Sequence, residues 1–271
     1  KRIGIGISCV FWLSGGWSTS GSVMVNEDGS VRFVTGATDM GTGYLYTSVP
    51  QIVGKVLGLL PEEIKIVYGD TDTVGYDHGI GGSRGVFAVG MVAKMAAEQT
   101  KKRLFEAAAR KWNVRPDCLE TQGGRIWLQG NPQDYLTFAE ISYEEHMLNN
   151  GPVIGTASYL PQMDDIDPQR VKGLSFPAFK GNTIGCHIAV TEVDTKTGEM
   201  NILRYIAAHD AGKVINQAMV EGQIEGGTAL GIGYGTLEEM IFDKEGGVVN
   251  PNLADYKLPT ALDVPEVETV L

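Results

Sequence analysis

The sequence predicts an α+β fold made of two similar halves, in which strand hairpins pack with helices. Alternating apolar segments around a turn occur near Ser22 and again near His187, which is the pattern of a β-hairpin. Each hairpin is followed by a glycine-containing loop and then by a segment with helical spacing of its apolar residues. Residues 149–152 (Asn-Asn-Gly-Pro) form the best linker. We therefore expect two halves, residues 1–150 and 151–271.

The first half contains two apolar patterns, alternation for strands and helical spacing for helices. Pro61 and Gly123 mark breaks between these segments. In order, the expected elements are a hairpin with strands at 22–26 and 31–35, a helix over 44–58, a strand at 64–68, a long helix over 86–112, a second hairpin over 119–128 and a helix over 136–147.

The second half repeats the order strand, turn, strand, glycine loop and helix. The expected elements are strands at 187–193 and 200–207, a helix over 217–234 and an extended tail over 256–271. Two copies favour an internally duplicated domain, because solenoid arrays usually need at least about three repeats.

Composition excludes several classes of function. The net charge is -11 without a basic stripe, so we expect no nucleic-acid partner. No apolar run approaches the roughly 20 residues of a membrane span. Cys9, Cys118 and Cys186 are far apart and form no C-x-x-C, so we expect no metal site within the chain and a reducing, cytoplasmic location. Because Lys1 stands where an initiator methionine would be, we expect a piece of a longer protein.

Glycine is abundant, at 36 of 271 residues, and three glycine-containing segments stand out. The first loop contains Met40, Gly41, Thr42 and Gly43 before a predicted helix. Its backbone N–H groups could turn toward a ligand at the helix N-terminus. The alternative is a plain turn.

The second loop, over 79–85, places glycines beside a hydroxyl and a guanidinium. Its candidate site residues are Gly81, Gly82, Ser83, Arg84 and Gly85. This combination suits an anionic ligand or one with many acceptors. The alternative is a flexible loop with Arg84 solvated.

The third candidate is Gln223, which lies among glycines early in the last predicted helix. Glycine costs roughly 1 kcal/mol in a helix interior, so Gly222 and Gly226 need an explanation. Close helix packing and contact with bulky cofactor rings are both compatible with the pattern. The glycine loops lack the third glycine of a dinucleotide fingerprint and the lysine of a P-loop, which argues against a nucleotide-binding enzyme.

Five motifs in order connect these loops to a known family. They are Asp-Met-Gly-Thr-Gly at 39–43, Gly-Asp-Thr-Asp at 69–72, Gly-Ser-Arg at 82–84, His-Asp-Ala-Gly-Lys-Val-Ile-Asn at 209–216 and Glu-Gly-Gln-Ile-Glu-Gly at 221–226. The sequence resembles, over essentially its whole length, the second molybdopterin-binding domain in the large subunit of the xanthine dehydrogenase, aldehyde oxidase and carbon monoxide dehydrogenase family.

The resemblance implies a cofactor and its contacts. The family binds molybdenum through molybdopterin, in some members as the cytosine dinucleotide, and needs no protein metal ligand. Met40 to Gly43 would lie beside the pterin, the loop from Gly81 to Gly85 would line the cofactor and its phosphate end, and Gln223 would hydrogen-bond the pterin. Many members carry Gln where this sequence has Thr42, a shorter side chain that could lose the contact.

The resemblance also implies a function shared with other polypeptide segments. The family oxidises heterocycles, aldehydes or carbon monoxide with oxygen from water. Its catalytic Glu is expected beyond Leu271, and Glu266 and Glu268 do not match the motif. The implied partners are the rest of the large subunit, iron–sulfur and flavin (FAD) domains or subunits, and a small-molecule substrate. The chain alone is expected to be inactive. The alternative is a non-catalytic assembly module that keeps the fold without metal.

Overall fold

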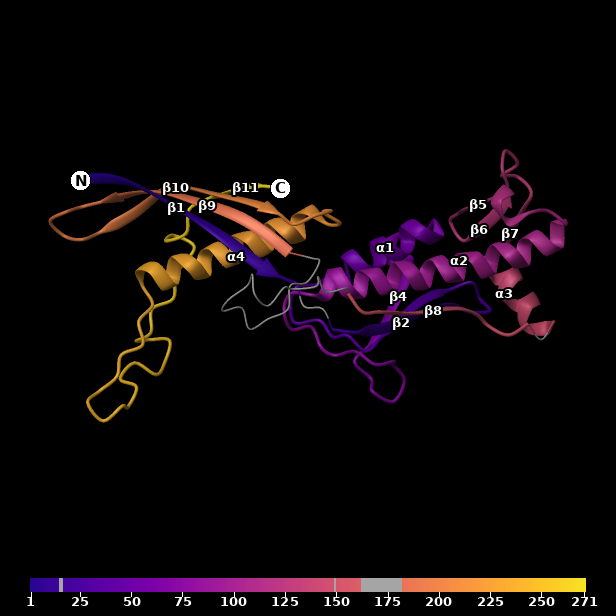
Figure 1. Ribbon diagram of the computed structural model, residues 1–271, viewed down its shortest axis with the longest axis horizontal. Coiled ribbons are helices and arrows are strands. Elements are labelled where there is room, and N and C mark those ends of the chain that lie inside the picture. Colours follow the sequence, from indigo (N-terminus) through magenta and orange to yellow (C-terminus); the bar gives the residue numbers. More distant parts are fainter. Residues whose placement is uncertain (15–16, 149, 162–181) are drawn as a thin grey trace, which may run out of the picture. The chain divides into compact units, whose positions relative to one another are not determined.

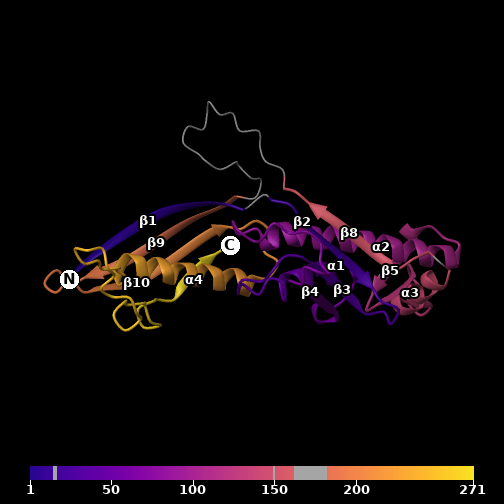
Figure 2. The same ribbon diagram turned by 90° about the horizontal axis from the view of Figure 1, so that it is seen from below.

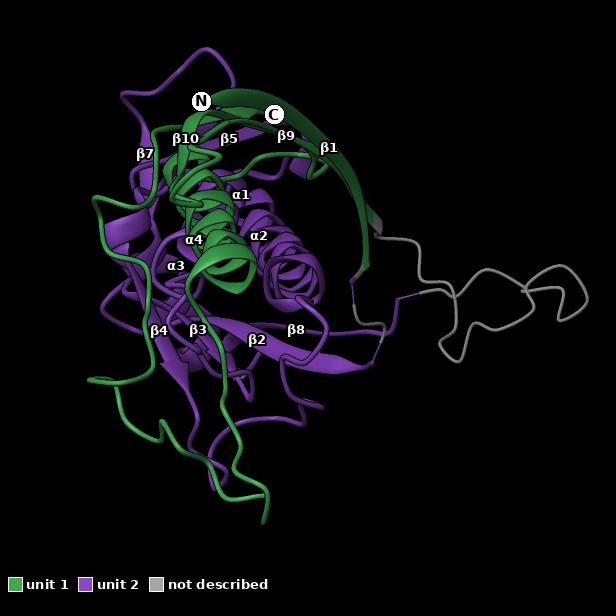
Figure 3. Ribbon diagram, turned by 90° about the vertical axis from the view of Figure 1, so that its left-hand side faces the viewer, with its two compact units in different colours: residues 1–12, 182–271 green, residues 13–181 purple. Residues whose placement is uncertain are grey.

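The computed structural model describes residues 1–14, 17–148, 150–161 and 182–271. It divides into two compact units, and Figure 3 colours them separately. Unit 1 comprises residues 1–12 and 182–271, and unit 2 comprises residues 13–181. These units differ from the predicted division at 150/151, because the chain passes from unit 1 to unit 2 and back again. Asn149, in the predicted linker, lies outside the described residues.

Unit 2 contains a four-stranded sheet in the order β4-β3-β2-β8 (Figures 1 and 2). Its strands are β2 (Thr19–Val25), β3 (Val31–Thr35), β4 (Ile64–Tyr68) and β8 (Val153–Tyr159). The hairpin β2–β3 and the strand β4 are confirmed. Strand β8 follows the predicted linker in sequence but pairs antiparallel with β2. That pairing could not be predicted, because the two strands are more than a hundred residues apart.

Two helices cover one face of this sheet, α1 (Ser48–Leu57) and α2 (Gly90–Trp112). The predicted first helix begins four residues later than expected, since residues 44–47 form a turn instead. A π-helical turn, Gly85–Val89, precedes α2. The core between helices and sheet consists of fully buried aliphatic and aromatic side chains, among them Val23, Phe33, Val49 and Val92.

A small subdomain completes unit 2. The hairpin of β5 (Leu119–Gln122) and β6 (Arg125–Leu128) is confirmed, and β7 (Tyr135–Thr137) adds a third strand. The last helix of the unit, α3 (Phe138–Met147), begins later than predicted because Thr137 caps it. The Thr137 hydroxyl accepts from the Glu140 amide, and the Glu140 carboxylate accepts from the Thr137 amide. Short 3₁₀ turns at Pro61–Glu63 and Pro116–Cys118 lead into β4 and β5.

Unit 1 contains a second four-stranded sheet, in the order β1-β9-β10-β11, with one long helix on one face (Figures 1 and 3). Its elements are β1 (Arg2–Leu13), β9 (Asn182–Val193), β10 (Met200–Asp210), α4 (Gln217–Thr236) and β11 (Val267–Val270). Strands β9 and β10 form the predicted antiparallel hairpin. Asn216 caps α4 by accepting from the Met219 amide.

The two units share one topology. In each, an antiparallel hairpin leads through a glycine loop into a helix, and the following strand pairs parallel with the second hairpin strand: β3 with β4 and β10 with β11. The α+β class with hairpins and helices is confirmed, and the internal repeat is visible in the order of the strands. None of the described helices combines the length and apolar character required to cross a bilayer.

Candidate functional site

The first predicted loop lies between β3 and α1 in unit 2, and Asp39 organises it. One Asp39 oxygen, Oδ1, accepts from the amides of Gly41 and Gly43, at 2.7 and 3.1 Å. These N–H groups therefore point into the loop, which corrects the expectation that they turn toward a ligand. The Met40 side chain is 71% exposed, and Gly41 has φ of 100° with open space on its Cβ side. The surface of the loop therefore consists of the exposed Met40 side chain beside Gly41, and Thr42 is also exposed.

Tyr44 brings the first and second loops together. Its phenol donates to the Thr38 carbonyl at 3.1 Å, and its ring is buried. A Cβ on Gly85 would lie only 3.2 Å from two of the Tyr44 ring carbons. Burial raises the pKa of the Tyr44 phenol far above its ordinary value, and the carboxylates of Asp77 and Asp39 raise this pKa further. Loop residues 39–44 and 79–85 are therefore parts of one packed structure.

Arg84 is the largest fully buried side chain of the described residues. Its guanidinium donates to the carbonyl oxygens of Trp17 and Gly79 and faces the buried Asp77 carboxylate, with Nη1 3.4 Å from Oδ1. Both readings of Arg84 from sequence are corrected, because the side chain is neither solvated nor presented to an anionic ligand. It ties the second loop to residue 17 at the start of unit 2.

The centre of the second loop has an unusual backbone. Gly82 has φ of 76°, and Ser83 has φ of 56°. Ser83 is one of two non-glycine residues in the described chain with positive φ, the other being Asn113 at the end of α2. Such a conformation is costly for a residue with a Cβ and tends to occur where function demands it. Ser83 is exposed and lies just before the π-helical turn that leads into α2.

The glycines in and around the two loops divide into two groups by their surroundings. Gly85 and Gly36 are packed, since a Cβ on either would press on a neighbour: the Tyr44 ring for Gly85 and the Gly75 carbonyl for Gly36. Gly79 and Gly81, like Gly41 in the first loop, face open space with no atom within 4 Å. The packed glycines serve the fold, whereas a side chain at the open ones would meet no atom of the described residues within 4 Å.

Gln223 lies on α4 in unit 1, and its side chain is exposed. Gly222, Gly226 and Gly227 around it also have no atom within 4 Å of a hypothetical Cβ. Close packing of this part of α4 against a neighbour within the described chain is therefore wrong as an explanation of these glycines. Ile224 and Thr228 form the buried side of the helix.

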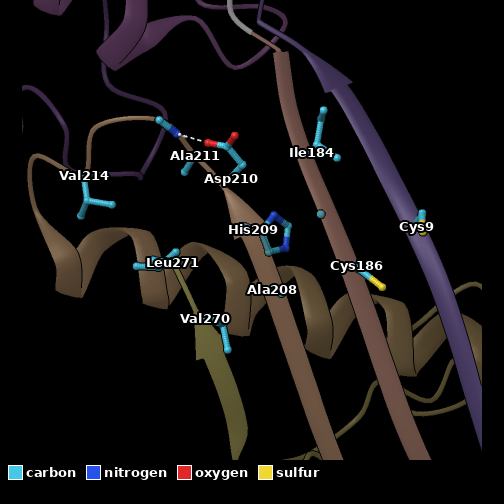
Figure 4. Close-up of a pocket in the computed structure, with 12 residues that line it drawn as sticks. Cys9, Ile184, Cys186, Ala208, His209, Asp210, Ala211, Val214, Val270 and Leu271 are labelled. Atoms are coloured by element: carbon cyan, nitrogen blue, oxygen red, sulfur yellow. Dashed lines mark hydrogen bonds between the residues drawn. The ribbon is translucent and has the colours of Figure 1, made fainter.

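Unit 1 contains a cavity that the sequence did not reveal (Figure 4). Its volume is about 460 Å³, and its walls are mostly apolar side chains from β1, β9, β10 and β11. Asp210 lies at its edge and accepts from the Gly212 amide at 3.0 Å, which closes the loop after β10. The only sequence signal was the 209–216 motif, part of which forms this wall.

Histidines on β9 and β10 lie next to this cavity. The Nε2 atoms of His187 and His209 are 2.7 Å apart, and His187 Nδ1 is 3.0 Å from the Tyr205 hydroxyl. Burial lowers the pKa of His187, and the nearby His209 lowers it further. Within the described ranges, no group of three or more His, Cys, Asp or Glu residues is placed to hold a metal ion.

Comparison with known proteins shows what this arrangement belongs to. A family model described as "Molybdopterin cofactor-binding domain" matches residues 1–265. The chain therefore belongs to the molybdopterin cofactor-binding domain family. Solved structures agree: quinoline 2-oxidoreductase from Pseudomonas putida 86 gives a TM-score of 0.83 at 27% identity, covering 98% of this chain and 34% of that one. Reconstituted CO dehydrogenase from Oligotropha carboxidovorans gives a TM-score of 0.82 at 26% identity. That match covers 99% of this chain and 33% of that one.

The relatives are subunits of molybdenum oxidoreductases. The xanthine dehydrogenase molybdenum-binding subunit of Escherichia coli O157:H7 is 29% identical over 278 residues, which covers 99% of this chain and 35% of that protein. The carbon monoxide dehydrogenase large chain of Hydrogenophaga pseudoflava is 29% identical over 254 residues, covering 94% and 30%. The resemblance deduced from the motifs is confirmed. The chain spans about a third of the length of these relatives.

Proposed function

We propose that the chain is the molybdopterin-binding part of a molybdenum hydroxylase and holds one side of the cofactor. The observation that carries this proposal is the pair of open glycine surfaces, Gly41 with Gly79 and Gly81 in unit 2, and Gly222 with Gly226 in unit 1. Such surfaces could accept a planar pterin, because no atom of the described residues lies within 4 Å of a Cβ placed on these glycines. Membership of the family supports the assignment.

The proposed contacts follow from what each residue presents. Met40, Gly41, Thr42 and Gly43 offer an exposed loop edge to the pterin, and Gln223 offers an amide that can both donate and accept. Gly81, Gly82, Ser83 and Gly85 form the second loop, in which the exposed Ser83 hydroxyl is the candidate contact for the phosphate end. Arg84 stays in the proposed site as a positioning residue, because its guanidinium holds this loop rather than a ligand.

When bound, the cofactor would supply two-electron oxidation of a substrate with oxygen from water. The relatives' names point to nitrogen heterocycles, as in nicotine 6-hydroxylase and quinoline 2-oxidoreductase, to xanthine, or to carbon monoxide. We propose a small molecule of this range as substrate, and molybdopterin or its cytosine dinucleotide as cofactor. Iron–sulfur clusters and FAD would lie on other domains or subunits. Because the chain covers about a third of its relatives, we propose that it does not catalyse alone.

The test is molybdenum analysis of the full-length protein, combined with dye reduction using purines, aldehydes, quinolines and carbon monoxide. We expect close to one molybdenum per chain and turnover of one substrate class, and we expect neither from the 271 residues alone. A full-length protein that folds but contains no molybdenum would favour the alternative, a non-catalytic module. Turnover by the 271 residues alone would contradict the proposed dependence on further segments.

A further inference from the structure

The sheet of unit 1 has one face that its own helix leaves uncovered (Figures 1 and 3). On the covered side Ala207 is fully buried. On the other side, Ile3, Ile5 and Ile7 of β1 are 69%, 69% and 68% exposed, and Phe11 is 56% exposed. These four residues alternate along β1 with Gly4, Gly6 and Ser8, so they share one face of the strand.

The neighbouring strand continues this apolar face. Gly4 of β1 approaches Thr191, and Val10 approaches Gly185, so β1 runs antiparallel to β9 with Cys9 opposite Cys186. Both cysteines line the same cavity, together with Ile184 on β9, which is 55% exposed. We call this surface, defined by Ile3, Ile5, Ile7, Cys9, Phe11, Ile184 and Cys186, the apolar sheet face.

The apolar sheet face is arranged like the centre of an interface. Two ion pairs stand at its margins: Lys1 with Glu192, at 2.7 Å, and Arg204 with Glu268, whose Nη2 and Oε2 are 2.6 Å apart. An apolar centre with a polar rim is the usual anatomy of a contact surface. The cavity of about 460 Å³ beside Cys9 and Ile184 is large enough to receive an inserted side chain.

We infer that the apolar sheet face is covered by the remainder of the same large subunit, the part of the polypeptide outside these 271 residues. The inference deepens the proposed function and rests on it. The relatives carry about two thirds of their length outside the matched region, so such a segment is present in each of them. A face this apolar fits a permanent contact, because obligate interfaces are more hydrophobic than transient ones.

The test places a photo-cross-linker at the centre of this face in the full-length protein. Ile5→p-benzoylphenylalanine should leave unit 1 folded, because the Ile5 side chain is 69% exposed within the described chain and is not part of the core of that unit. After irradiation, mass spectrometry of the cross-linked peptide identifies the occupant. The matched control is Leu262→p-benzoylphenylalanine, since Leu262 is also in unit 1 and is 97% exposed.

A cross-link from position 5 to a peptide outside the 271 residues, at least fivefold above the Leu262 control, supports the inference. A cross-link to residues 13–181, a cross-link to a second copy at twice the mass, or a yield no higher than the control each overturns it. Molybdenum content of the same preparation is measured independently. A molybdenum-free protein with the expected cross-link contradicts the proposed function, and a molybdenum-loaded protein without it contradicts only the docking surface.

A second measurement uses the thiols as reporters. Cys9 is exposed in this chain. If the rest of the full-length protein covers it, maleimide should label Cys9 at least tenfold more slowly in the folded full-length protein than in the same protein unfolded in urea. Ile5→Glu together with Ile7→Glu should restore labelling of Cys9, whereas Leu262→Glu should not. Equal labelling of Cys9 with and without urea would overturn the inference.

Discussion

Arg84 and Asp77 form an ion pair whose side chains are 0% and 2% exposed, with Nη1 3.4 Å from Oδ1. The pair joins the second glycine loop to Asp77 just before it and is supported by carbonyl and hydroxyl groups: Trp17 and Gly79 accept from Arg84, and Thr19 donates to Asp77. A buried pair is costly to form and costlier to break, because one partner left alone is an uncompensated charge. The loop conformation therefore depends on it.

Arg84→Ala should destabilise unit 2 by about 3–5 kcal/mol, the usual effect of leaving a buried charge unpaired. Urea unfolding followed by tryptophan fluorescence measures this loss. The matched control is Arg115→Ala, which breaks an exposed pair with Asp117 (80% and 65% exposed) and should cost no more than about 1 kcal/mol. Equal, small losses in both variants would show that Arg84 does not hold the loop.

Gly85→Ala should destabilise the chain by about 1–3 kcal/mol, because the added methyl group presses on the Tyr44 ring. The comparison is Gly81→Ala in the same loop, where no atom lies within 4 Å and φ is not positive. That change should alter stability by no more than about 0.5 kcal/mol. Thermal unfolding of the two variants measures this difference. A larger loss of stability in Gly81→Ala than in Gly85→Ala would contradict the assignment of Gly85 as packed and Gly81 as open.

Gly81 also offers the cleanest test of cofactor contact. Gly41 and Gly82 have positive φ, so a side chain there strains the backbone whether or not a ligand is present. Gly81→Val carries no such strain, and in the full-length protein it should reduce molybdenum content by at least half with little change in melting temperature. Full molybdenum content in this variant would support the plain-turn interpretation of the loop.

Gln223→Leu should leave the melting temperature unchanged, because the Gln223 side chain is exposed. In the full-length protein it should lower molybdenum content or turnover several-fold, since a leucine can neither donate nor accept a hydrogen bond. Gln217→Leu, at the exposed start of the same helix, is the control and should keep both. If Gln223→Leu retains full molybdenum and activity, the proposed contact does not exist.

Tyr44 predicts a loss of stability at alkaline pH. Burial raises the pKa of its phenol in the folded state, so its neutral form stabilises the fold at pH values below about 10, where the unfolded phenol is also protonated. Above that pH the unfolded phenol loses its proton and the contribution declines. The free energy of unfolding of the unchanged protein should therefore fall more steeply above pH 10 than that of Tyr44→Phe.

Urea titrations between pH 8 and pH 11 measure this difference. Tyr143→Phe is the control, because Tyr143 is exposed on α3, and its pH profile should match that of the unchanged protein. Parallel profiles for the unchanged protein and Tyr44→Phe would contradict the buried, neutral phenol.

The sequence by itself determined the local elements and the family. Alternation of apolar residues on both sides of the turns at 27–30 and 194–198 predicted both hairpins. The ordered motifs predicted molybdopterin binding. Both kinds of pattern consist of residues that are neighbours in sequence. Only the tertiary structure decided the rest. Arg84 is buried through a bond to Trp17, 67 residues away, and β8 pairs with β2 across the predicted linker. The burial of a side chain and the pairing of a strand depend on such distant contacts. The sequence alone therefore does not distinguish a packed glycine from an open one, or a buried arginine from an exposed one.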